Sequence, residues 1–550
     1  MKNSIFFLDR FNTVAEQIAY ALWVIAVIYA GVMAVDFVLG FPVPVIQETF
    51  LKSKSLRKPF EFSFLFFVLG VLIHPNREKI LGTIKEKAER FAAWPGSIWV
   101  LSFTYFLLFL WGQITRYLSL EINFIPFLFY DYMLWFFEQG KFCFTGFLHG
   151  YYHVNLILLL VYPVWKVFHS TWVLHVAQPL IAALAAVPFF FWTRDQMKNP
   201  LLALIAAFLF LNYRYLQNVL SVNFAVELFY PLFIFSAVFF ASRRMNFFYY
   251  LSVLLGLLIK EDAPLYFGAL GFAYLIARDW RRGLTTLFLS AGYGLFILKV
   301  FLPWSGSTIL KGDEGNFELR PTELFQKPWI VIRELFIPKE KIETIFKLTS
   351  KLIFLPFASP WFFLVLAAIL PLFFRPWQPI AEQSVDQFLE LSLYYSAPVL
   401  PFLFLAFVHG WTRLKTSRLY GPAWIRWAVP GLLIFLNAFN FRPEHFTKED
   451  LATIQTAKTL PRDQVVVTQG HLLPYLGYRK WNFYIAGHYA NEKESREAYL
   501  NPDYYFFDFG ANAYPLTPQQ LRDKADALKN DSRYQIRHED QRRLLLETNL

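Results

Sequence analysis

The sequence predicts an α-helical membrane protein with many crossings and a small α/β domain at its C-terminal end. Of its 550 residues, 56% are hydrophobic and only 17% are charged, whereas soluble chains average about 45–50% apolar and about 25% charged residues. The mean hydropathy is +0.36, and long apolar stretches recur along the first 440 residues. These observations exclude an ordinary soluble enzyme.

The charge distribution also favours a membrane protein. The chain has 52 basic and 41 acidic residues, a net charge of +11, yet residues 441–550 hold 15 of each. The whole excess therefore precedes residue 441, as expected for cytoplasmic loops, which collect Lys and Arg. We expect no nucleic-acid partner. The single cysteine, Cys143, forms no internal disulfide and has no cysteine neighbours for a zinc or redox motif, so it leaves the redox compartment open.

The apolar stretches are long enough, or nearly so, to cross about 30 Å of hydrocarbon. The first is longer than the core of a signal peptide and has no small-residue cleavage site, so we expect it to be a retained helix. Together the stretches predict about 11 to 13 transmembrane helices. They cover residues 15–40, 60–74, 98–117, 172–192, 201–217, 225–241, 247–259, 263–277, 284–302, 345–357, 361–374, 388–408 and 424–437.

Basic clusters predict the orientation of these helices. If the spans alternate, the clusters fall on one cytoplasmic side, provided that residues 345–374 form two short helices broken near Ser359 and Pro360. The chain after residue 441 then lies outside. A further basic group in residues 52–58 does not fit, so residues 1–95 have no defined orientation. The clusters are Lys79, Lys85, Lys87 and Arg90; Arg194 and Lys198; Arg243 and Arg244; Arg278, Arg281 and Arg282; and Arg413, Lys415 and Arg418.

Three regions follow from this pattern. Residues 1–95 form N-terminal membrane helices, residues 96–440 form the main membrane domain, and residues 441–550 form a small α/β domain outside the membrane. Two large outer loops interrupt the membrane domain, at 119–153 and 303–344. The first is aromatic and amphipathic, which is typical of helices that lie in the membrane interface.

The C-terminal domain shows its own pattern. Two apolar strands are expected around Val466 and Phe506, and a helix over 521–528, preceded by a capping threonine, would cover them. Because the domain is neutral, we expect a specific contact with the membrane domain rather than attraction to anionic lipid. Arg479 and the aromatic run 481–484 are the candidates for that contact.

A series of motifs resembles one family over residues of about 129 to 508. In order they are YDYMLWFFEQG, HVNLILLLVYPVW, NFAVELFYPL, KEDAPLYFGALGFAYLIARDWRRG, LKVFLP, LYYSAPVLPFLFLA, and LLPYLGYR followed by DYYFFD. Their order resembles the DUF2079 family of bacterial polytopic membrane proteins, which is similar in layout to the GT-C glycosyltransferases.

The resemblance implies a GT-C-like glycosyltransferase of the bacterial inner membrane. Such an enzyme moves a sugar from a polyprenyl-phosphate donor to an acceptor on the outer face, so its partners are a lipid-linked sugar and membrane lipids. Four polar positions of the family pattern are replaced here, by Pro126, Ala225, Tyr394 and Tyr475. A non-catalytic scaffold or binding subunit that engages a membrane or extracytoplasmic protein partner is therefore the alternative.

The reaction needs a base near the acceptor and positive charge near the leaving phosphate. Asp131 is a carboxylate within an aromatic interfacial run in the first outer loop, where GT-C enzymes keep their base. Lys260 is the candidate phosphate-binding cation within the membrane domain. Arg214 and Lys299 lie at outward span ends and are further candidates, with snorkelling to lipid headgroups as the alternative for each.

Other polar groups in the spans suggest a pocket, because charged side chains in hydrocarbon are costly without a role. Glu261 and Asp262 either hold a divalent cation, Mg²⁺ or Mn²⁺, or orient Lys260. Glu227 is expected to face the bundle as a partner of Arg214 or of His153, the one histidine of its loop that the resemblance supports.

Overall fold

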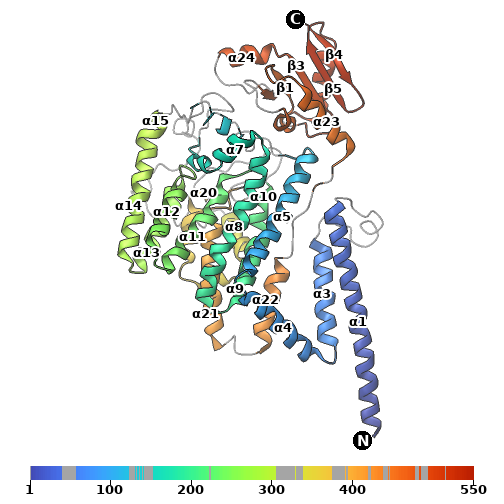
Figure 1. Ribbon diagram of the computed structural model, residues 1–550, viewed down its shortest axis with the longest axis vertical. Coiled ribbons are helices and arrows are strands. Elements are labelled where there is room, and N and C mark those ends of the chain that lie inside the picture. Colours follow the sequence, from blue (N-terminus) through green and yellow to red (C-terminus); the bar gives the residue numbers. More distant parts are fainter. Residues whose placement is uncertain are drawn as a thin grey trace.

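Helices form an elongated bundle with a small α/β domain at one end (Figure 1). The predicted class, a polytopic helical protein with a small C-terminal sheet, is confirmed. The computed structural model describes residues 2–39, 57–122, 130–131, 133–135, 137–138, 153–221, 224–304, 339–373, 394–418, 423–437, 446–476, 482–484, 493–513 and 516–549, with single residues 140, 329, 391 and 444.

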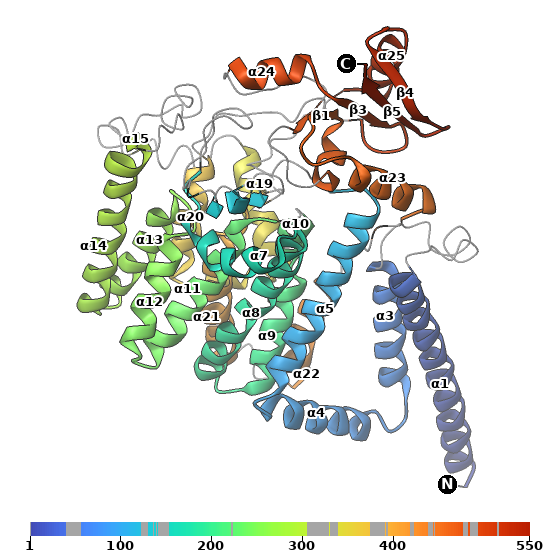
Figure 2. The same ribbon diagram turned by 45° about the horizontal axis from the view of Figure 1, so that its top comes forward.

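The chain begins with an antiparallel helix pair, α1 (Lys2–Leu39) and α3 (Arg57–Ile73). Trp23 of α1 stacks on His74 at the end of α3, with ring centroids 5.5 Å apart. Helix α4 (Arg77–Ala93) follows and lies across the end of the bundle that is farthest from the α/β domain (Figure 2). The N-terminus lies toward the same end (Figure 1), which gives the first helices an orientation that their sequence left open.

The central bundle starts with α5, which runs from α4 to the α/β domain (Figure 2). Helices α13 and α14 pack closely at Gly271 and Gly283, where a Cβ on Gly271 would lie 3.1 Å from the Gly283 carbonyl oxygen. Small residues allow such close approach between membrane helices. The bounds are α5 (Ser97–Leu118), η2 (Leu156–Leu160), α7 (Tyr162–Phe168), α8 (Trp172–Met197), α9 (Pro200–Asn212), α10 (Arg214–Ser221), η3 (Val226–Leu228), α11 (Phe229–Ser242), α12 (Asn246–Leu257), α13 (Ala263–Ile276), α14 (Trp280–Phe296), η4 (Ile297–Phe301) and α15 (Leu302–Trp304).

Within the described residues, four helices are long and apolar enough to cross a membrane, and the α9–α10 pair, bent by 41°, makes a fifth. The other predicted crossings that fall on these residues coincide with shorter elements. Five of them are apolar helices of 10 to 17 residues, Phe62–Ile73, Val226–Ser242, Asn246–Leu257, Ala263–Ile276 and Phe362–Phe373. The outer loops 119–153 and 303–344 fall largely outside the described residues.

The predicted basic clusters gather at one end of the bundle, beside α4. Arg243 after α11 pairs with Asp195 near the end of α8 at 2.8 Å, and Lys415 of α21 (Leu400–Thr416) donates to the Met197 carbonyl oxygen at 2.7 Å. We call this the basic end and the opposite end, which carries the α/β domain, the tail end. Alternating spans therefore place the clusters together, as predicted.

The segment expected to be broken consists of α19 (Lys339–Ser350), the short η6 (Leu355–Ala358) and α20 (Phe362–Phe373). The Lys341 ammonium donates to the Phe373 carbonyl oxygen at 2.7 Å, so the start of α19 meets the end of α20. The prediction of two short helices with a break between them is confirmed, but the first helix ends at Ser350, so the break begins earlier than expected. The chain then continues through α21 (Leu400–Thr416) and α22 (Ala423–Leu436).

The tail domain is a five-stranded mixed sheet in the order β2-β1-β3-β5-β4. Strand β1 pairs in parallel with β2 and β3, whereas β5 pairs antiparallel with β3 and β4. Both predicted strands are confirmed as β1 and β3; the β4–β5 hairpin was not predicted. The bounds are α23 (Lys448–Thr459), β1 (Val466–Thr468), η8 (Gly470–Tyr475), β2 (Asn482–Tyr484), α24 (Lys493–Leu500), β3 (Tyr504–Asp508), α25 (Pro518–Lys529), β4 (Tyr534–Glu539) and β5 (Arg543–Thr548).

Helix α25 covers the sheet, as predicted. The Thr517 side chain and Gln520 form a reciprocal capping box at its start, which satisfies backbone N–H groups that no helical carbonyl can reach. Leu521 and Ala525 are then buried in one cluster with residues of β1, β3 and β5. Burial of this apolar face holds the helix on the sheet.

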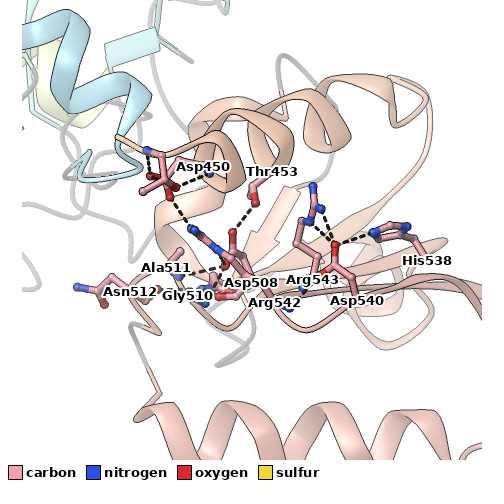
Figure 3. Close-up of polar contacts among 12 residues, drawn as sticks. Asp450, Thr453, Asp508, Gly510, Ala511, Asn512, His538, Asp540, Arg542 and Arg543 are labelled. Atoms are coloured by element: carbon pink, nitrogen blue, oxygen red, sulfur yellow. Dashed lines mark hydrogen bonds and ion pairs between the residues drawn. The ribbon is translucent and has the colours of Figure 1, made fainter. Parts of the chain in front are cut away.

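A polar network ties α23 to the sheet (Figure 3). The fully buried Asp508 carboxylate accepts from the Thr453 hydroxyl at 2.5 Å, from Arg542 Nε at 2.6 Å and from the Gly510 N–H at 2.8 Å. Arg542 also donates to Asp450 at 2.6 Å. Burial would lower the pKa of Arg542, but the bonds to the two carboxylates raise it above its ordinary value. Charge-assisted hydrogen bonds therefore hold α23 against the sheet.

The tail domain rests on the end of α5. The Tyr475 hydroxyl donates to the Tyr117 carbonyl oxygen at 2.6 Å, and the Lys458 ammonium lies 5.7 Å from the centroid of the Tyr117 ring. Arg116 pairs with Glu444 at 3.8 Å. Arg479 and residue 481, expected to make this contact, lie outside the described residues, and residues 482–484 form β2.

We predict that Gly410→Ala destabilises the protein. A Cβ at Gly410 would lie 1.9 Å from the Leu355 carbonyl oxygen, a backbone atom that cannot rotate away, whereas a Cβ at Gly431 would meet no atom within 4 Å. Overpacking of this kind costs about 1–3 kcal/mol. Thermal unfolding in detergent should show a lower apparent Tm for Gly410→Ala than for Gly431→Ala. Equal values for the two variants would contradict the close α21–η6 contact.

The positions of the basic clusters predict that the tail domain is outside the cell membrane. In a Cys143→Ser background, Asn530→Cys should react with an impermeant maleimide added to spheroplasts, whereas Lys87→Cys on α4 should react only after lysis. Both side chains are exposed, so access to the reagent decides the result. Labelling in the opposite order would place the tail in the cytoplasm.

Candidate functional site

The centre of the site is the charged turn between α12 and α13, residues 260–262. A second segment of the chain, which carries His153, holds this turn in place. The Asn155 amide donates to the Ile259 carbonyl oxygen at 3.1 Å, and the Ile157 N–H donates to the Leu258 carbonyl oxygen at 2.8 Å. Both hydrogen bonds join this segment to the residues just before the turn, so two distant parts of the sequence fix its position.

Lys260 and Glu227 form a buried ion pair. The Lys260 ammonium lies 2.9 Å from Glu227 Oε1, and the two side chains are 6% and 4% exposed. The ammonium also lies 5.6 Å from the centroid of the Tyr394 ring. The other carboxylate oxygen of Glu227 has no hydrogen-bond partner among the described residues. A buried pair costs desolvation energy that its own attraction barely offsets, so this pair is a candidate for function.

The two acids of the turn point to different partners. Glu261 accepts from the Val154 N–H at 3.0 Å and lies 2.6 Å from His153 Nδ1. Asp262 accepts from the Tyr230 hydroxyl at 2.5 Å. Each charged residue of the turn therefore binds a different element: Lys260 reaches η3, Glu261 reaches the segment before η2, and Asp262 reaches α11.

Asp131 lies against α7, which lies toward the tail end of the bundle (Figure 1). This residue is only 3% exposed, and the Trp165 indole of α7 donates to its Oδ1 at 3.3 Å. The neighbouring Tyr130 interacts electrostatically with Glu227 and Lys260. The structure thus places a buried carboxylate next to the tyrosine that borders the Lys260–Glu227 pair.

The structure corrects the expected partner of Glu227. Glu227 was expected to pair with Arg214 or His153, but it pairs with Lys260, because η3 brings it under the α12–α13 turn. Arg214, at the start of α10, and Lys299, in the π-helical turn η4, are exposed. No hydrogen bond or ion pair joins either of them to the cluster among the described residues, and exposure fits snorkelling to headgroups.

The carboxylates expected to bind a divalent cation already interact with other protein groups. Glu261 is engaged with His153, and Asp262 with Tyr230. In the described part of the chain, no group of three or more His, Cys, Asp and Glu side chains is arranged to hold an ion. Mg²⁺ and Mn²⁺ prefer several oxygen ligands, so of the two alternatives for these acids the positions favour orientation of the turn.

Several residues of the site were not predicted. Tyr130, Tyr230 and Asn155 contact the charged turn or its neighbours, and an aromatic or amide in an apolar stretch gives no local signal of such a contact. Two of the replaced family positions also have clear contacts. Tyr394 lies over Lys260, and Tyr475 binds α5; Ala225 is buried, and Pro126 lies outside the described residues.

The fold and the cluster define a class: a polytopic helical membrane protein with a buried polar site at one end of its bundle. The family model of DUF2079, described as a predicted membrane protein, matches residues 128–545. The chain therefore belongs to the DUF2079 family, as its motifs indicated.

The similarity of this chain to solved structures is distant. Among solved structures, the crystal structure of ArnT from Cupriavidus metallidurans bound to undecaprenyl phosphate is similar with a TM-score of 0.45 and 12% sequence identity. The similarity covers 82% of this chain and 98% of ArnT. No curated protein sequence matches the chain.

We predict that Lys260→Met destabilises the protein by about 3–5 kcal/mol, because it leaves Glu227 buried without its partner. Adding Glu227→Leu should recover most of this loss, since it removes the carboxylate that Lys260→Met leaves without its partner. The matched control is Lys85→Met, which removes one partner of the exposed Lys85–Glu89 pair and should cost less than about 1 kcal/mol. Apparent Tm values in detergent test this. A Lys260→Met variant as stable as the control would contradict the buried pair.

Proposed function

We propose that the protein is a membrane glycosyltransferase that moves a sugar from a polyprenyl-phosphate donor to an acceptor on the outer face of the inner membrane. One observation carries the proposal: the tail end of the bundle holds a buried cation, Lys260, in the charged cluster with Glu227, Glu261 and Asp262 that we call the Lys260 layer, and a buried carboxylate, Asp131, beside α7. Buried ionisable groups within membrane proteins are rare and usually functional. Family membership and the GT-C-like layout of its motifs agree with this proposal.

The two residues match the needs of the reaction. The acceptor hydroxyl attacks the anomeric carbon, its proton passes to the Asp131 carboxylate, and the bond between that carbon and the phosphate oxygen breaks. The electron pair leaves with the phosphate, and the configuration at carbon inverts. Lys260 offsets the charge that grows on the phosphate, because an ammonium has three donors and its bond to Glu227 uses one.

The other residues of the cluster act as positioning groups in this proposal. Glu227 keeps the Lys260 ammonium charged and directed, and Asp262 and Glu261 fix the turn through Tyr230 and His153. Arg214 and Lys299 are exposed and have no hydrogen bond or ion pair with the cluster among the described residues, so we assign them to lipid headgroups rather than to the donor phosphate. The exposed apolar helix surfaces, such as α14 with Phe288 at 78% exposure, fit a chain surrounded by lipid.

The proposed orientation of the protein in the membrane rests on the distribution of charge. The basic end faces the cytoplasm by the distribution of Lys and Arg, which puts the Lys260 layer and the tail domain on the outer side. Lipid-linked donors would then reach the layer from the outer leaflet, and the tail domain would border the acceptor.

A non-catalytic role is the second candidate, and one observation favours it. Each charge of the 260–262 turn is already bound to a protein group, as in a purely structural network. A scaffold or binding subunit would keep the fold and use the tail domain to hold a protein partner. Co-purification of a stoichiometric partner, together with no turnover of any lipid-linked sugar, would establish this role.

The enzyme is tested with Asp131→Asn. Purified protein in lipid nanodiscs is given polyprenyl-phosphate sugars, and release of polyprenyl phosphate is measured. The variant should lose at least about 100-fold in turnover, the usual contribution of a general base, while donor binding persists. Glu138→Gln is the control, because Glu138 lies on the same segment but pairs with the exposed His169 at 2.9 Å. Full activity of Asp131→Asn would contradict the proposed base.

A further inference from the structure

A cavity of about 290 Å³ lies at the basic end of the bundle, far from the Lys260 layer along the helices. It is partly open to the surroundings and lies between α8, α11, α13 and α21 and the start of α20, toward the helix ends at the basic end. These helix ends are the ones that precede or carry the basic clusters. The lining includes Trp192, Gln196, Leu270, Trp361, Leu405 and His409.

The lining suits a hydrocarbon chain. Most of its side chains are aliphatic or aromatic, with Val238, Leu270 and Leu364 as examples from three different helices. Apolar cavities stay dry, and one of only about 150 Å³ is large enough to bind benzene. Two tryptophans in the lining, Trp192 and Trp361, are the residue type that marks the depth of the membrane interface. The cavity is therefore apolar and lies where lipid chains meet headgroups.

One lining residue offers a polar contact. His409 Nδ1 is buried and has no hydrogen-bond partner among the described residues. Gln196 and Thr412 also line the cavity. A buried nitrogen without a partner is costly, and the headgroup end of a lipid entering the cavity could satisfy it.

Basic residues flank the lining residues along the chain, and one of them, Arg243, is already paired with Asp195 at 2.8 Å. Arg194 and Arg243 lie at the ends of α8 and α11, and Arg413 and Lys415 lie in the last turn of α21, next to the lining residue Thr412. Arg413 is exposed and donates through Nη1 to the Ala358 carbonyl oxygen at 3.0 Å, which leaves most of the five donors of a guanidinium for other groups. Guanidinium groups bind phosphate through paired hydrogen bonds.

We propose that this cavity binds one acyl chain of an anionic phospholipid of the inner leaflet, with the lipid phosphate held by Arg413 and its basic neighbours. The apolar lining receives the chain, and the flanking basic residues select the headgroup. The site is independent of the proposed transferase reaction, because it shares no residue with the Lys260 layer and lies at the opposite end of the bundle. A bound lipid here would fill the space between α13, α20 and α21.

The test measures lipid binding by native mass spectrometry of the full-length protein after delipidation, with phosphatidylglycerol and phosphatidylcholine added at equal concentrations. The wild-type protein should bind one phosphatidylglycerol at least about fivefold more tightly than phosphatidylcholine, since one charge-assisted contact is worth about 1 kcal/mol or more. Ala273→Leu fills the cavity and should weaken phosphatidylglycerol binding at least about tenfold. The control Gly292→Leu adds similar bulk on α14, where a Cβ meets no atom within 4 Å, and should leave binding unchanged.

A second variant, Arg413→Gln, keeps the cavity and tests the flanking basic residues. It should lose the preference for phosphatidylglycerol while still binding one lipid. This variant tests the proposal by itself if Ala273→Leu fails to fold. Equal binding of the two lipids by the wild-type protein would overturn the proposal, as would unchanged binding by Ala273→Leu. Retention of a polyprenyl phosphate in place of phosphatidylglycerol would also overturn it, because the cavity would then belong to the donor.

Discussion

The buried pair of Lys260 and Glu227 is the interaction on which the tail-end layer depends. It joins the α12–α13 turn to η3 below it, and the neighbouring acids extend the connection to His153 and Tyr230. Because hydrocarbon cannot solvate an isolated charge, each partner restricts where the other can lie. The short helices on both sides of the turn thus meet at a defined depth, and the Tyr394 ring lies beside the Lys260 ammonium.

The bundle separates two environments along its length. At the tail end, Lys260 and Glu227 are buried and paired, and the tail domain rests on α5 through Tyr475 and Glu444. At the basic end, the charges are largely at the surface, and the space between the helices is apolar. This difference between the two ends agrees with the sequence, in which the clusters of Lys and Arg lie in the loops at the basic end.

Much of the fold was predictable from local pattern. The strands around Val466 and Phe506, the helix after Thr517 and the two short helices flanking Ser359 were predicted because hydrophobic period, capping and breakers act over a few residues. The β4–β5 hairpin was missed because its alternation is weak: β4 carries exposed residues after Tyr534.

The candidate site, in contrast, was predictable only in its residue types. Lys260, Glu227 and His153 were expected in a polar pocket, since charge within apolar sequence indicates one. Which of them pair was not predictable, because the partners are 33 and 108 residues apart and their pairing depends on how the helices pack.

The central claim is that the Lys260 layer receives the phosphate of a polyprenyl lipid. Photo-crosslinking measures this most directly, with a polyprenyl phosphate that carries a diazirine beside the phosphate, followed by mapping of the labelled peptides. The account predicts labelling of the peptides that contain Tyr130 and Tyr394, reduced by competing unlabelled polyprenyl phosphate. Labelling confined to the helices around the basic-end cavity, or to the outward faces of α1 and α14, would contradict it.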